Sequence, residues 1–219
     1  MPTPILHHAP LVRIVCPGPA LDLERLELEV AASPDVPLLA VNVAIALVPR
    51  ADAWLALDPP TSKVLRVVWD DYLLMEPRPV HRMNGAYAIA WQRELAKASP
   101  EARRAVTRET PYLQRPLLPG DASIRDKRVR DMMSRTPRYT TFAALATAFE
   151  WYAPNVIEVR GATMGGDGYK LERASEAAHA GPKARGVGPA GRWEKERLAM
   201  ARWCDALEEW GVEVRVFQD

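Results

Sequence analysis

Short apolar runs alternate with turn residues along the first seventy positions of the chain. Val12–Cys16 is a β-branched run stopped by Pro17-Gly18-Pro19, which predicts a buried strand that enters a tight loop. Asp22 stands where a helix N-cap is expected, ahead of leucines at helical spacing. Three more runs predict strands, with a short apolar segment, Val43–Val48, after the first of them. The three runs are Pro37–Val41, Ala53–Leu57 and Val64–Trp69.

The same kind of order returns in the last third of the chain. Thr140-Thr141 predicts a threonine cap for an amphipathic helix that continues to Phe149. Val156–Val159 predicts a strand, and Arg192–Trp210 a long helix closed by Gly211 before a final strand, Val212–Phe217. In the middle, Asn84–Lys97 and Ala102–Thr107 have helical spacing, whereas Pro111–Pro137 is rich in proline and basic residues and predicts an irregular flap.

Alternating strands and helices indicate an α/β fold. We expect a Rossmann-like, mainly parallel sheet with helices on both faces, because parallel strands need crossover connections. The 219 residues fit one domain, 1–219, in which residues 70–139 form an irregular basic insertion or flap.

Composition says more about the protein's cellular surroundings than about any reaction it catalyses. The charges of the 29 basic and 28 acidic side chains nearly cancel. The net charge of the protein therefore does not point to a polyanion as its partner. No apolar run is long enough to span a membrane, which predicts no membrane association. Cys16 and Cys204 lie far apart without metal-type spacing, and they favour a reduced, cytoplasmic setting over a disulfide.

Candidate binding residues follow the predicted strands, where parallel sheets bind ligands. Gly18 allows close approach of the backbone, and the helix after it directs N–H groups at an anion. Asn42 offers an amide for a sugar or base, and Asp58 a carboxylate for a hydroxyl or metal. The glycine-rich loop 161–169 adds a further carboxylate and an aromatic ring. Asparagine, aspartate and glycine at strand ends are also ordinary turn residues.

Two further features widen the choice of chemistry. His81 and His179 are candidate general bases near neutral pH. A basic segment, 103–138, could grip phosphates of a nucleotide, a lipid head or DNA, or could be a solvated surface. Its cations are Arg103, Arg104, Arg108, Arg115, Arg125, Lys127, Arg128, Arg130, Arg135 and Arg138.

Several of these segments resemble bacterial sialyltransferases and the related 6-hydroxymethylpterin diphosphokinase-like domains. The similarity lies in segments 16–21, 40–42 and 51–58, and in the helix after Thr140-Thr141 with the strand 156–161. The resemblance implies that a first group of residues lines a nucleotide pocket and that a second group completes it. The first group is Gly18, Pro19, Ala20 and Asn42, and the second is Thr141, Gly161 and Tyr169. Pro17 and Ala20 replace an asparagine and a serine of the family, and the aspartate after Gly161 is missing.

The resemblance implies a glycosyltransferase-like enzyme that uses a nucleotide-activated sugar as donor. The acceptor would be a glycan or modified phage-type DNA. Asp58, Asp167 and His179 are the candidate catalytic bases, and Arg192 would steady the departing phosphate. Two alternatives stay open. One is a diphosphokinase that holds Mg²⁺ with Asp58 and Asp167, and the other is a degenerate domain that binds a nucleotide or a protein without catalysis.

Overall fold

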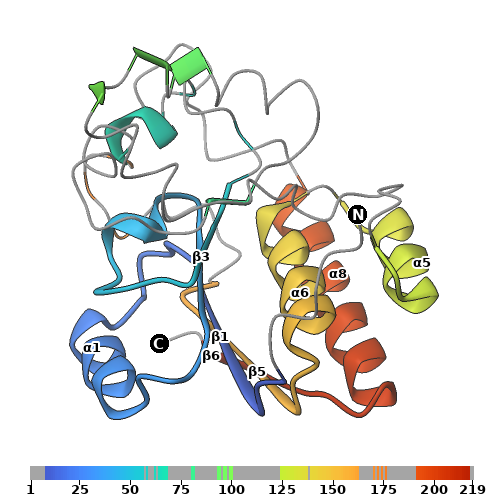
Figure 1. Cartoon of the computed structure of the whole chain (residues 1–219). Helices are drawn as coiled ribbons and strands as arrows, with labels where there is room; N and C mark the ends of the chain where they lie inside the picture. The colour runs from blue at the N-terminus through green and yellow to red at the C-terminus, as the bar shows by residue number, and fades with distance from the viewer. Residues whose placement is uncertain are drawn as a thin grey trace.

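The fold is a six-stranded parallel sheet in the order β4-β3-β2-β1-β5-β6, covered by helices on both faces (Figure 1). It is seen in a computed structural model that describes residues 8–56, 58, 62, 64–68, 80–81, 93–94, 96–97, 99–100, 124–137, 139–162, 170, 172, 174, 176 and 191–217. Every described strand pair is parallel. The prediction of a Rossmann-like α/β fold is therefore confirmed.

The central strand of the sheet is β1, which pairs with β2 on one side and β5 on the other; Ile14 faces Leu39 and Val159 in register. The chain builds β2, β3 and β4 outward on one side before it returns to build β5 and β6 on the other. This reversal puts the topological switch point between β1 and β5. The strands are β1 (Leu11–Val15), β2 (Leu38–Val41), β3 (Ala53–Leu55), β4 (Val80–His81), β5 (Val156–Arg160) and β6 (Glu213–Phe217).

Two apolar layers sandwich the sheet because side chains alternate along each strand. Val12, Ile14 and Cys16 face the layer of α5, α6 and α8, whereas Val15 faces the layer of α1 and η1. Figure 1 shows α5, α6 and α8 together on one side of the sheet and α1 on the other. The helices are α1 (Leu23–Ala32), η1 (Asn42–Ala46), α5 (Lys127–Arg135), α6 (Thr140–Tyr152) and α8 (Arg192–Glu209).

Local signals explain the helix ends that the sequence predicts correctly. The Asp22 side chain caps α1 by accepting a hydrogen bond from the N–H of Arg25 at 3.0 Å. Gly211, with a φ of 85°, follows α8 in the left-handed conformation that closes helices. The chain can then enter β6 directly.

The predicted strand Val64–Trp69 is wrong, because residues 64–68 are helical. The Oγ of Ser62 accepts a hydrogen bond from the N–H of Leu65 at 3.2 Å and so starts a helical turn. Leu65 and Val68 are buried and Arg66 is exposed, which is a helical pattern of burial. The fourth strand of the sheet is Val80–His81 instead.

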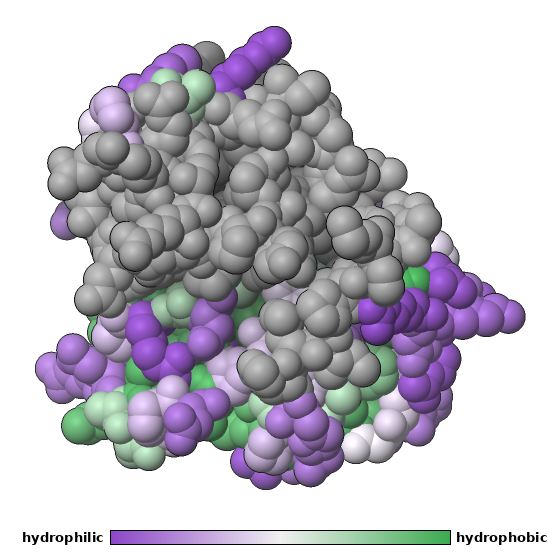
Figure 2. All heavy atoms as spheres, in the orientation of Figure 1, coloured by the Kyte–Doolittle hydropathy of each residue, from purple (hydrophilic) through white to green (hydrophobic). Residues whose placement is uncertain are grey.

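The prediction that 111–137 is irregular is wrong for its last part. Residues 127–135 form α5, which buries Val129 and Met133 in the core against α6 and starts at an Asp126 cap. Hydrophilic side chains gather over α5 on the outer surface (Figure 2). The predicted threonine cap of α6 is also wrong: Tyr139 is the N-cap residue, and Thr140 and Thr141 lie inside the helix.

Much of the predicted insertion 70–139, most of the helix Asn84–Lys97 and all of Ala102–Thr107 lie outside the described residues. In the part of the chain that the structure describes, no helix has the length and apolar character needed to cross a lipid bilayer.

Candidate functional site

The ends of β1 and β2 and the start of α6 meet at the carboxyl edge of the sheet. Because α6 leads into β5, which is parallel to β1 and β2, α6 must begin at the edge where β1 and β2 end. The structure shows two direct contacts that follow from this topology. Thr140 donates a hydrogen bond to Oδ1 of Asn42 at 3.2 Å, and Thr141 Oγ1 lies 3.8 Å from the Sγ of Cys16.

Asn42 is held in an unusual backbone conformation at the end of β2. Its φ is 51°, in the left-handed region that asparagine tolerates better than most residues. The indole Nε1 of the buried Trp54 donates to the carbonyl oxygen of Asn42 at 2.6 Å. With its carbonyl fixed by β3 and its side chain bound to Thr140, Asn42 joins two layers of the fold at the predicted pocket.

Two of the helices that begin at this edge, α1 and α6, differ in how their N-termini are satisfied. At α1, the carboxylate of Asp22 caps the helix, so negative charge already occupies the position of an anionic ligand. At α6, the N-cap residue Tyr139 makes no side-chain capping hydrogen bond. Helix N-termini attract anions through their N–H groups and dipole. An anion at this edge is therefore better accommodated at α6 than at α1, where the sequence suggested it.

The loop after β1 is joined to the end of β5 by the backbone. Cys16 N–H donates to Arg160 O at 2.8 Å, and Gly18 N–H donates to Gly161 O at 2.9 Å. The N–H of Gly18 is thus engaged within the protein. Pro19 is half-buried and Ala20 is exposed at the outer side of the loop. Among the predicted nucleotide-binding residues, the fold brings Gly18 next to Gly161. Asn42 contacts Thr140, and Thr141 contacts Cys16.

The predicted catalytic residues are less closely gathered. Asp58 is exposed, beyond the end of β3, and Arg192 is the first residue of α8. Asp167, His179 and Tyr169 lie outside the described residues. Within the described ranges, no three histidine, cysteine, aspartate or glutamate side chains form a group that could hold a metal ion. The roles given to these residues stay predictions.

A carboxylate that the sequence did not single out is Glu196. It is buried, with 6% exposure, on the face of α8 that also carries Ala199, Met200 and Trp203. The N-terminal end of α8 lies at the carboxyl edge because α8 leads into β6. The helical spacing of positions 196, 199, 200 and 203 could have shown from the sequence that Glu196 lies on the buried face of the helix. A charged residue inside that apolar stripe marks a position with a special environment.

Cys16 is buried beside Thr141 and cannot act as a nucleophile. Burial raises the pKa of its thiol to about 12; the hydrogen bond with Thr141 lowers that pKa, and the charge of Glu196 raises it. Only the thiolate is a strong nucleophile. Both cysteines are free thiols.

We expect Cys16 to be inert in the folded protein. At pH 8, about 1 in 10,000 molecules would carry the thiolate, since each pH unit below the pKa lowers that fraction about tenfold. Ellman's reagent applied to a Cys204→Ser variant should give no colour over hours in buffer and one thiol per chain in guanidinium. Rapid reaction of the folded variant would contradict this picture. The reciprocal Cys16→Ala variant reports the half-buried Cys204 alone.

Part of the basic segment 103–138 is described, and two of its arginines serve the fold there. Arg128 pairs with Asp126 at 2.6 Å, and its guanidinium lies 5.0 Å from the ring centre of Trp210. Arg130 donates to the carbonyl oxygen of Ile124 at 2.7 Å. These two cations are committed to internal contacts. A DNA contact through this segment stays a prediction that depends on its other residues.

Comparisons of the chain with models of protein families, with curated proteins and with solved structures found no match. The chemistry of the site therefore has to follow from its own residues.

Proposed function

We propose that the carboxyl edge of the sheet binds the nucleotide part of an activated sugar and that the protein is a glycosyltransferase-like enzyme. The observation that carries this proposal is the meeting of Asn42 with Thr140 beside the N-terminus of α6. Open parallel sheets bind ligands at this edge, next to the strand where the order reverses. The similarity of the same segments to bacterial sialyltransferases supports a sugar donor.

Different groups at the carboxyl edge of the sheet can bind the phosphate and the nucleoside of such a ligand. The start of α6 favours a phosphate, through its N–H groups and the positive end of its dipole. The amide of Asn42 can donate to a base or ribose oxygen while its Oδ1 accepts from Thr140. Proton transfer from the acceptor hydroxyl requires a base. Glu196 joins Asp58, Asp167 and His179 as a candidate for that role, because it is a buried carboxylate near the start of α8.

Calorimetric titration with CMP, UDP, GDP, ADP and ATP, with and without Mg²⁺, tests the proposal. We expect one nucleoside mono- or diphosphate to bind selectively, and we expect Asn42→Gly to weaken it at least about tenfold, the cost of a lost hydrogen bond to ligand. Glycine keeps the left-handed backbone and removes only the side chain. Thr140→Val should weaken binding, whereas Thr140→Ser, which keeps the hydroxyl, should not.

The outcomes separate the three functions. Release of free nucleotide from a nucleotide-sugar donor supports the transferase. Mg²⁺-dependent turnover of ATP would instead identify a diphosphokinase, and binding without any turnover would identify a degenerate domain. If well-folded protein binds none of the five nucleotides, or if Asn42→Gly binds as tightly as the unchanged chain, this edge of the sheet is not the site.

A further inference from the structure

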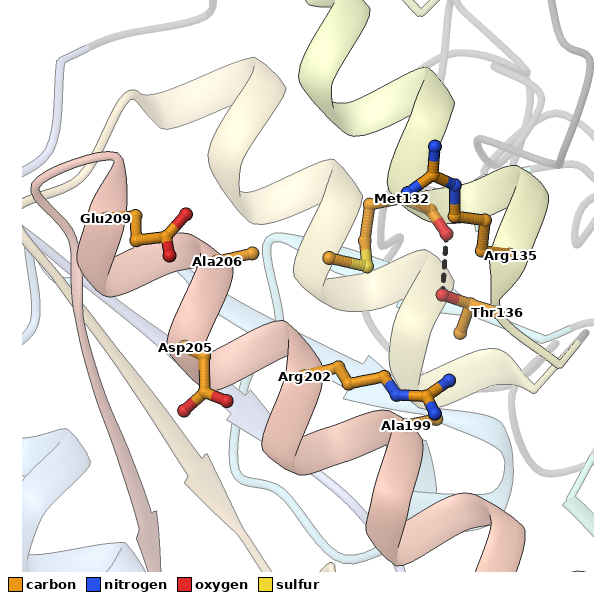
Figure 3. Close-up of a pocket in the computed structure, with 8 residues that line it drawn as sticks. All are labelled: Met132, Arg135, Thr136, Ala199, Arg202, Asp205, Ala206 and Glu209. Atoms are coloured by element: carbon orange, nitrogen blue, oxygen red, sulfur yellow. Dashed lines mark hydrogen bonds between the residues drawn. The ribbon is translucent and has the colours of Figure 1, made fainter.

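A groove lies between α5 and α8, on the face of the molecule away from the α1 layer (Figure 3). Its volume is about 370 Å³. Apolar side chains of Met132 and Ala206 form its middle, and four charged side chains stand around them. The groove is separate from the carboxyl edge of the sheet, since it runs along the second half of α8 toward that helix's C-terminus.

The walls of the groove are fixed by hydrogen bonds. The indole Nε1 of the fully buried Trp203 donates to Oγ1 of Thr136 at 3.1 Å. Thr136 Oγ1 in turn donates to the carbonyl oxygen of Met132 at 2.7 Å. These bonds tie the end of α5 to the middle of α8. The charged residues that project from the two helices are therefore held at set positions relative to each other.

The charges are sorted along the groove. Arg135 and Arg202 lie toward one end and Glu209 lies toward the other, with Asp205 between Arg202 and Glu209 along α8 (Figure 3). All four are exposed. None of them forms an ion pair with another residue of the described ranges, although Arg202 and Asp205 are only three positions apart on one helix. The groove thus presents a cationic end, an apolar middle and an acidic end.

We propose that a second copy of this chain occupies the groove, in a two-fold symmetric dimer with antiparallel α8 helices. A surface with opposite charges at its two ends is complementary to itself when it is turned by 180°. Arg202 and Glu209 are seven residues, or about two turns, apart and so share one face of α8. With the two-fold axis between Asp205 and Ala206, Arg202 of each copy lies opposite Glu209 of the other.

One exposed apolar residue supports this arrangement. Leu198 is 55% exposed and lies one turn before Arg202, so it extends the apolar surface along α8. Large exposed apolar side chains next to a groove are typical of interaction sites. In the proposed dimer, the opposite charges set the antiparallel orientation of the two α8 helices and favour a second copy as the partner. The apolar residues contribute the surface that becomes buried.

The symmetry allows a test by charge exchange within one chain. We expect the unchanged protein to sediment as a dimer in about 20 mM salt and to dissociate at least several-fold more readily in about 500 mM salt, where charges are screened. Arg202→Glu and Glu209→Arg should each weaken the dimer at least about tenfold, because like charges then face each other twice. The double variant, which carries both changes, should regain the dimer, because the introduced glutamate of each copy then faces the introduced arginine of the other.

The matched control is Glu208→Arg, an exposed site on the same helix that does not line the groove. It should leave the dimer unchanged. Circular dichroism and thermal melting of each variant show whether α8 is intact, and Glu209→Arg, near the helix end, serves if Arg202→Glu fails to fold. A protein that stays monomeric at all concentrations overturns the proposal. So does a dimer that ignores the single reversals, or a double variant that stays monomeric.

Discussion

Replacing Gly161 by alanine is expected to lower the free energy of unfolding by about 2–5 kcal/mol. Two separate costs add at this position. Gly161 has a φ of 68°, a left-handed conformation that costs an L-residue about 1–2 kcal/mol. A Cβ there would also overlap the carbonyl oxygen of Cys16 and lie 3.1 Å from the Cβ of Leu21. Overpacking of this kind costs about 1–3 kcal/mol, since backbone has to move.

Two other glycines of the chain isolate the second cost. Gly191 and Gly211 have φ values of 76° and 85°, but a Cβ at either would meet nothing within 4 Å. Gly191→Ala and Gly211→Ala should therefore lose only the backbone cost of about 1–2 kcal/mol each. Urea unfolding of the three variants, followed by circular dichroism, gives the comparison. If Gly161→Ala is no less stable than the two controls, the loop after β1 does not pack on β5 as described.

The same substitution bears on the proposed site. The N–H of Gly18 bonds to the carbonyl oxygen of Gly161, so displacement of residue 161 moves the loop that follows β1. A folded Gly161→Ala protein is expected to bind nucleotide more weakly if that loop lines the pocket. The absence of a side chain at position 161 would thus be needed both for stability and for the position of the loop at the carboxyl edge.

The parallel sheet could be predicted because its strands are buried on both faces. Such strands are mainly apolar runs, as in Pro37–Val41 and in Val12–Cys16, where Arg13 is the one charged residue, and turn residues bound them clearly. The same property explains the error at Val64–Val68. A short, mainly apolar run looks alike as a buried strand or as a helical segment. Here the Oγ of Ser62 accepts a hydrogen bond from the N–H of Leu65, which favours the helix.

The site could be predicted only in outline. Its location followed from strand ends, which local sequence signals mark. The pairing of Asn42 with Thr140 spans 98 residues, and no local pattern encodes it. The dense cations around α5 hid the apolar spacing of Val129 and Met133, which places that helix in the core. Long-range contacts of this kind depend on the whole packed chain.

Removing the carboxylate of Glu158 is expected to destabilise the protein by about 3–5 kcal/mol. Glu158 accepts from Nε of Arg13 at 2.9 Å and lies 3.6 Å from the guanidinium of Arg160. All three side chains are more than nine-tenths buried, on the face of β1 and β5 that α1 covers, where Arg13 and Arg160 also approach Glu29 of α1. A buried pair that loses one partner leaves an uncompensated charge, which costs far more than the pair contributes. Glu29, 2.9 Å from Arg160, offsets part of that loss.

Glu213 on the neighbouring strand provides the matched control. It pairs with Arg215 at 2.8 Å, but both side chains are about half exposed, at 54% and 47%. Exposed ion pairs contribute little to stability because solvent screens them, so Glu213→Gln should be nearly neutral whereas Glu158→Gln is severe. A combined Arg13→Met, Glu158→Leu and Arg160→Met variant should recover most of the stability, because apolar residues of similar size remove these three buried charges. Glu29 keeps its ion pair with Arg25 at 3.0 Å. Equal midpoints of urea unfolding for Glu158→Gln and Glu213→Gln would mean that water reaches the Arg13–Glu158–Arg160 cluster, and the deep burial that separates it from the surface pair on β6 would be incorrect.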